Sequence, residues 1–91
     1  MIYFYQNDGT ISQFNLSFQL SEQKQYGDLV KKILTNINNY IYSIRKIIVM
    51  VQNDEEDIKE LEINVDIEFK NEIEDPEKIV KILVYERERD E

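Results

Sequence analysis

The sequence predicts an α+β fold in which a sheet of four or five mainly antiparallel strands carries one helix on one face. Strict alternation of apolar and polar residues indicates strands in residues 14–20 and 60–69. A helical spacing of apolar residues indicates a single helix after the first of these segments. An apolar run rich in β-branched residues, at 46–52, is typical of a strand buried on both faces. The expected element order is β-β-α-β-β-β.

The first two strands are expected to form a hairpin. Residues 2–5 are short and apolar, and the Asn-Asp-Gly sequence at 7–9 is a turn signal because Gly9 tolerates a positive φ. In residues 14–20, Phe and Leu alternate with Gln, Asn and Ser, which predicts a half-buried strand with one wet face.

The helix is expected to run from Asp28 to about Ile44, with Ser21 or Asp28 as its N-cap. At about 100° per residue the apolar positions form one stripe, and the remaining positions form a polar face. The helix should therefore pack on a sheet. The stripe consists of Leu29, Val30, Ile33, Leu34, Ile37, Tyr40, Ile41 and Ile44.

Residues 60–69, E-L-E-I-N-V-D-I-E-F, are expected to form the fourth strand after an acidic loop at 53–57. Alternation excludes a helix there, because a helix would spread the same residues around its whole circumference. For residues 77–86 two interpretations stay open. Asp75 and Pro76 resemble a helix start, whereas the Ile, Val and Tyr residues that follow favour a strand. We expect one compact domain at 1–86 with a charged tail at 87–91.

The order of hairpin and then helix resembles the opening of a β-grasp, ubiquitin-like fold. The resemblance covers the first half of the chain and lies in the order of the elements. The C-terminus lacks the paired glycines of conjugated ubiquitin-like proteins, so the resemblance does not imply a role as a modifier.

The composition argues against several functions. The 91 residues include 19 acids and 11 bases, a net charge of −8, whereas direct nucleic-acid binding and adhesion to an anionic membrane need excess cations. Without Cys or His the chain lacks a thiolate, the commonest metal ligand and the usual general base. Its two glycines do not form a phosphate-binding loop, and the acidic loop lacks the central Gly of a calcium loop. We therefore expect no catalysis, no cofactor and no metal site.

The chain also lacks the features of secreted and membrane proteins. Its N-terminus has no basic start followed by an apolar run, and no apolar stretch approaches the roughly 20 residues of a membrane span. We expect a cytoplasmic protein, in the host cytoplasm if the chain is viral, and no membrane partner.

The negative charge is concentrated in the C-terminal half. The first 52 residues contain three acids and five bases, and the remainder contains 16 acids and six bases. Alternate residues of a strand lie about 6.8 Å apart, which roughly matches every second phosphate of a DNA strand. The acids either solvate the domain or form a partner-binding surface. The candidate surface consists of Asp54, Glu55, Glu56, Asp57, Glu60, Glu62, Asp66 and Glu68.

A second candidate surface follows from the single helix, which covers only one face of the sheet. The first, third and fifth predicted strands are apolar on both faces, so one apolar set lacks a cover. Tyr and Met are favoured at protein interfaces. The set is either a possible oligomer interface or is hidden by bulges, twist and loops. It consists of Tyr3, Tyr5, Ile48, Met50, Leu83 and Tyr85.

These observations favour a small acidic, non-enzymatic protein-binding module that forms a homodimer. The sharper hypothesis is an inhibitor that mimics nucleic acid and blocks a basic host nucleic-acid-binding protein, because antagonists from phages and mobile elements often have this size and charge. The alternative is a homo-oligomeric structural or assembly subunit whose apolar sheet face is the interface.

Overall fold

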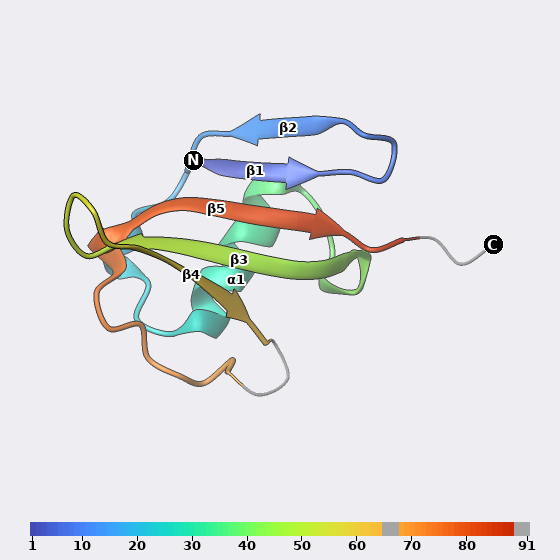
Figure 1. The fold of residues 1–91 in the computed structure, drawn as a ribbon. Coiled ribbons are helices and arrows are strands. Elements are labelled where there is room, and N and C mark those ends of the chain that lie inside the picture. Colours follow the sequence, from blue (N-terminus) through green and yellow to red (C-terminus); the bar gives the residue numbers. More distant parts are fainter. Residues whose placement is uncertain (65–67, 89–91) are drawn as a thin grey trace.

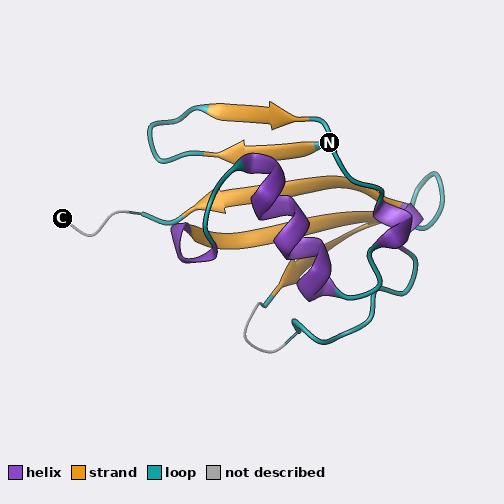
Figure 2. Ribbon diagram, turned by 180° about the vertical axis from the view of Figure 1, so that it is seen from behind, coloured by secondary structure: helices purple, strands orange, loops and turns teal. Residues whose placement is uncertain are grey.

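The computed structural model describes residues 1–64 and 68–88, and in this part of the chain one α-helix lies across one face of a five-stranded mixed sheet (Figures 1 and 2). The strands are β1 (Ile2–Tyr5), β2 (Ile11–Phe14), β3 (Ile44–Gln52), β4 (Ile58–Ile63) and β5 (Ile79–Glu86). The helices are α1 (Tyr26–Ile37) and the short 3₁₀ helices η1 (Leu20–Glu22), η2 (Ile41–Ser43) and η3 (Pro76–Lys78).

The strand order is β2-β1-β5-β3-β4, which places the last strand of the chain at the centre of the sheet. β1 pairs antiparallel with β2 and parallel with β5, and β3 pairs antiparallel with both β4 and β5. This arrangement confirms the α+β class and the mainly antiparallel sheet.

The core lies between α1 and the sheet face that it crosses. Apolar side chains of the helix stripe meet the inward-facing residues of β1, β3 and β5, and burying each large one stabilises the fold by about 1.5–3 kcal/mol. Among residues 1–64 and 68–88, no helix lies on the opposite face of the sheet (Figure 1). The fully buried side chains are Ile2, Leu29, Val30, Ile33, Ile47, Val49, Ile82 and Val84.

The predicted end of the helix at Ile44 is wrong, because α1 ends at Ile37. Asn38 adopts the left-handed conformation, with φ 55° and ψ 55°. The backbone N–H groups of residues 38–39 donate to carbonyls of the last helical turn, as in a Schellman motif. In the sequence, the helical spacing of apolar residues continues to Ile44. In the structure, Ile44 is the first residue of β3.

The helix begins slightly earlier than expected, at Tyr26, and neither Ser21 nor Asp28 is its N-cap. Gln25 precedes the first turn without a side-chain cap, and Asp28 lies within that turn. A carboxylate in this position favours the helix through its dipole. A residue between β4 and η3 provides a hydrogen-bond acceptor for the first turn of the helix. The N–H of Tyr26 donates to the Asn71 carbonyl at 3.0 Å.

The predicted strand at 14–20 is largely wrong, because only Phe14 belongs to β2. The alternation in burial is nevertheless present: the apolar residues are half-buried against the core and the polar ones are exposed. Here the backbone bonds to the side chain of Asn36 in α1 instead of to a neighbouring strand. Asn36 accepts from the Ser17 N–H at 2.7 Å and donates to the Asn15 carbonyl at 3.1 Å.

The predicted fourth strand is correct only in its first part, because β4 ends at Ile63. The Val65–Ile67 part of the prediction lies outside the described residues. Glu68 and Phe69 lie in a turn rather than a strand, and the Glu68 N–H donates to the Asn64 carbonyl at 2.8 Å. The C-terminal segment forms the strand β5, and the Asp75 cap starts only the single turn of η3.

Candidate functional site

The sheet face opposite α1 is the principal candidate surface, and Figure 1 shows this face with α1 behind it. Because successive side chains of a strand alternate between faces, one residue in two from each strand points to it. We call this surface the open sheet face. Its residues are Ile11 and Gln13 of β2, Tyr3 and Tyr5 of β1, Lys81, Leu83 and Tyr85 of β5, Lys46, Ile48, Met50 and Gln52 of β3, and Ile58, Glu60 and Glu62 of β4.

The centre of the open sheet face is apolar. Leu83 lies on the middle strand, between Tyr3 on one side and Ile48 on the other. Only 8% of Leu83 is exposed although no described helix covers it, because its neighbours shield it. The five other residues that the sequence marked as a possible oligomer interface are half-buried around it. The structure therefore brings that predicted set together on one surface, and its role as an interface stays a prediction.

Aromatic and cationic side chains form a ladder across three strands of this face. The rings of Tyr5 and Tyr85 stack, with centroids 4.7 Å apart and planes inclined by 9°. The Nζ atom of Lys46 lies 4.7 Å from the Tyr85 ring centroid, and the guanidinium carbon of Arg45 lies 5.5 Å from it. Each cation–π contact at an exposed site is worth about 0.5–1 kcal/mol.

A further cation covers Tyr3, since the Lys81 Nζ atom lies 4.4 Å from its ring centroid. The sequence prediction of the interface omitted Lys46, Lys81 and Arg45. For the two lysines the signal was present, because each stands two residues before an apolar member of the set. For Arg45 it was absent, because a register shift between Ile44 and Lys46 brings it to this side.

Acidic side chains border the apolar centre on the same face. Glu62 pairs across the strands with Ile48, and Glu60 pairs with Met50. Both glutamates are exposed. The two surfaces that the sequence suggested separately, one acidic and one apolar, are therefore in part a single surface.

The sequence predicts Glu60, Glu62, Asp66 and Glu68 on one face of the strand 60–69, but Glu68 does not lie on a strand. Asp66 lies outside the described residues, and Glu68 is half-buried in the turn after β4. Burial raises the pKa of Tyr26, and the charges of Glu68 and Glu74 raise this pKa further. The charge of Glu68 thus acts on Tyr26, at the start of α1. Of the four acids predicted on the strand, Glu60 and Glu62 are the two described ones that share a strand face.

The acidic loop between β3 and β4 uses two of its acids to hold its own turn. One carboxylate oxygen of Asp54 accepts from the N–H groups of Glu56 and Asp57, at 2.9 and 3.0 Å. The Asp57 carboxylate accepts from the Asn53 side chain at 3.2 Å. This is the ordinary turn chemistry of Asp. Of the four acids predicted to bind a partner in this loop, Glu55 and Glu56 are exposed without such a structural role.

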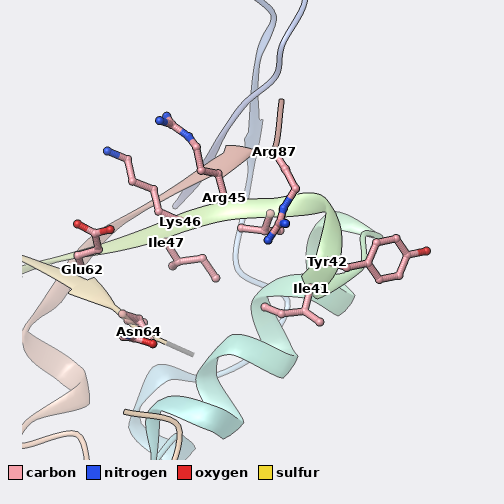
Figure 3. A pocket seen from close by; sticks show the side chains of 10 residues that line it. Ile41, Tyr42, Arg45, Lys46, Ile47, Glu62, Asn64 and Arg87 are labelled. Carbon is pink, nitrogen blue, oxygen red and sulfur yellow. The ribbon is translucent and has the colours of Figure 1, made fainter. Parts of the chain in front are cut away.

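A groove of about 670 Å³ opens where β3 begins (Figure 3). Ile41, Ile47 and Ile63 contribute to its apolar floor, and Arg87 and Glu62 contribute charge. Figure 3 shows Arg45 and Lys46 directed away from that floor. Ile47 and Ile63 of this floor belong to the core between α1 and the sheet, so the groove opens on the α1 side of β3 and is not part of the open sheet face.

Within residues 1–64 and 68–88, no three acids come together into a group that could hold a metal ion. Every buried polar side-chain atom of these residues has a hydrogen-bond partner. The same residues form no helix with the length and apolar character needed to cross a bilayer. Comparison of the chain with protein-family models, curated proteins and solved structures finds no significant match. The open sheet face is therefore the candidate functional site.

Proposed function

We propose that this chain is a non-enzymatic protein-binding module whose contact surface is the open sheet face. The observation that carries the proposal is the apolar centre at Leu83, flanked by Tyr3 and Ile48, on a sheet face without a helix. A face that only contacts water carries polar residues at such positions. The exposed side of residues 14–20 does so with Gln, Asn and Ser, and the open sheet face does not.

The surroundings of this centre support the same proposal. Protein interfaces typically combine an apolar core, often with Tyr or Met, and a polar rim. Here Lys46, Lys81, Glu60 and Glu62 surround the apolar residues.

We place the module in the cytoplasm, because a chain without cysteine gains nothing from an oxidising compartment.

An acidic surface that mimics nucleic acid is the second candidate. The observation that favours it is the exposure of Glu55, Glu56, Glu60 and Glu62 along the β3–β4 turn and β4, in a chain of net charge −8. Such a surface would bind a basic protein and would compete with nucleic acid for it. Its binding would weaken strongly as salt rises, because it depends on exposed charges.

Affinity capture from the source cell with matched variants tests both candidates. Ile48→Glu changes the apolar centre, and Glu60→Lys/Glu62→Lys changes the acidic rim. Tyr42→Glu is the control, because Tyr42 is 70% exposed and lies in η2, away from the open sheet face. Thermal unfolding of each variant verifies that it is folded.

The proposal expects Ile48→Glu to lose the captured protein and Tyr42→Glu to retain it. Loss with Glu60→Lys/Glu62→Lys alone, together with displacement by nucleic acid, would replace the first candidate by the second. A protein captured equally by all folded variants would contradict both.

A further inference from the structure

The charge of the open sheet face differs from that of the whole chain. The chain has a net charge of −8. Around the apolar centre, however, the cations Arg45, Lys46 and Lys81 outnumber the acids Glu60 and Glu62. Two copies of such an acidic chain repel each other over most of their surface. They would meet least repulsion where cations are present, which is on this face.

The two signs of charge occupy different strands of this face. Lys46 and Lys81 project from β3 and β5, and Glu60 and Glu62 project from the edge strand β4. A partner of a single charge sign would therefore be repelled by one part of the surface. A partner with both signs in adjacent strips fits it, and a second copy of this chain is such a partner. Two-fold symmetry pairs a surface patch with itself, so the acidic strip of one copy can face the cations of the other.

Single-stranded nucleic acid suits this face less well. Proteins that bind it present free aromatic ring faces on which bases stack. Here the Tyr5 and Tyr85 rings stack on each other, Lys46 and Arg45 approach Tyr85, and Lys81 approaches Tyr3. One face of the Tyr3 ring and one face of the Tyr5 ring are thus already in contact with other side chains, and Glu60 and Glu62 would repel phosphates.

We propose that the occupant of the open sheet face is a second copy of this chain, in a two-fold dimer with Glu60 and Glu62 of each copy opposite Lys46 and Lys81 of the other. This inference rests on the proposed function and names its partner.

A charge-exchange experiment tests the dimer by sedimentation velocity. One variant is Glu60→Lys/Glu62→Lys and the other is Lys46→Glu/Lys81→Glu. Each alone should raise the dimer dissociation constant about tenfold or more, because like charges then face each other. An equimolar mixture should recover a heterodimer close to wild-type affinity. A misfolded variant would not regain binding in this way, so recovery also verifies folding.

The first variant separates specific pairing from general repulsion. It makes the chain less negative, so general repulsion alone predicts a tighter dimer, whereas pairing predicts a weaker one. Lys31→Glu/Lys32→Glu is the control for the second variant, since it makes the same charge change on the exposed side of α1. This control should keep the wild-type dissociation constant apart from a small effect of net charge.

A wild-type chain that stays monomeric at about 1 mM would overturn this inference. A dimer unaffected by both charge exchanges, or a mixture that fails to recover, would overturn it as well. None of these outcomes decides the proposed function, which is judged separately by whether capture of any protein, this chain included, depends on Ile48.

Discussion

Gly27 shows how a single residue positions the loop that follows β4. It is buried in the first turn of α1, and its N–H donates to the Phe69 carbonyl at 2.9 Å. A Cβ atom at this position would lie 2.6 Å from the same oxygen. Intrinsic helix propensity favours Ala over Gly by about 1 kcal/mol. The contact opposes that gain, because a backbone oxygen held by a hydrogen bond has little freedom to move.

We predict that Gly27→Ala lowers the free energy of unfolding by about 2 kcal/mol, the range of overpacked sites. Urea denaturation of the variant and the wild type measures the change. Lys31→Ala, on the exposed side of the same helix, should change stability by less than about 0.5 kcal/mol. A gain in stability for Gly27→Ala would show that helix propensity outweighs the contact and that the loop can shift.

At the same scale, the residues of the candidate surface were only partly predictable. Period-two alternation identified which side chains of the strands share a face, and it thereby found Ile48, Leu83 and their apolar neighbours. It did not show that Glu60 and Glu62 lie beside them, because cross-strand register depends on pairing between distant segments. The position of Arg45 follows from a bulge, which single-strand periodicity does not reveal.

At the scale of elements, the segment 15–20 separates two properties that alternation usually joins. Its side chains alternate in burial as a strand's do, yet its backbone bonds to the helix through Asn36. The Asn36 side chain also accepts from the Ser17 hydroxyl. Periodicity reports which side chains face the core, and it does not report what the backbone pairs with. The same reason explains why the prediction for β4 extended too far.

We predict that Asn36→Ala lowers the free energy of unfolding by about 1–2 kcal/mol, since several hydrogen bonds to residues 15–17 are lost together. Amide hydrogen exchange at Ser17 should become faster, because its N–H loses its acceptor. Asn15→Ala is the matched control, as the Asn15 side chain takes part in none of the hydrogen bonds described for residues 1–64 and 68–88. Unchanged protection of Ser17 in Asn36→Ala would contradict the role of Asn36.

The helix end illustrates a conflict between two local signals. The apolar stripe of the sequence continues to Ile44, and two consecutive asparagines at 38–39 interrupt it. Asn is among the few residues that enter the left-handed conformation readily, so the asparagines end the helix despite the stripe. The C-terminal segment forms a strand, as its β-branched residues favour, although Asp75 and Pro76 are typical of a helix start. These two residues start only one 3₁₀ turn before β5.

At the scale of the whole molecule, the sequence predicted the class of fold and the single covered face. It did not predict that β5 lies at the centre of the sheet, parallel to β1. β1 and β5 are far apart in the sequence, and no local sequence pattern predicts that they pair. The central position matters for the candidate surface, because it places Leu83 between β1 and β3 and so makes three apolar strands into one continuous face.

The net charge of −8 affects the stability of the whole molecule. Excess charge of one sign destabilises a compact state by self-repulsion, and at 0.1 M salt charges more than about 10 Å apart are largely screened. Salt also weakens the cation–π contacts of the open sheet face, but these are few, whereas 16 acids lie after residue 52. Screening of repulsion should therefore dominate.

We predict that the melting temperature rises by about 3 °C between about 0.01 M and about 0.3 M sodium chloride, which for a domain of this size corresponds to under about 1 kcal/mol. Calorimetry on the Ile48→Glu variant separates this effect from self-association, because a glutamate at the centre of the open sheet face should weaken the proposed dimer. Glu55→Gln/Glu56→Gln, added to that variant, should show a smaller rise, because both glutamates are exposed and contribute to the repulsion. A melting temperature that falls with salt would mean that attraction between the cations and acids outweighs the repulsion from the net charge.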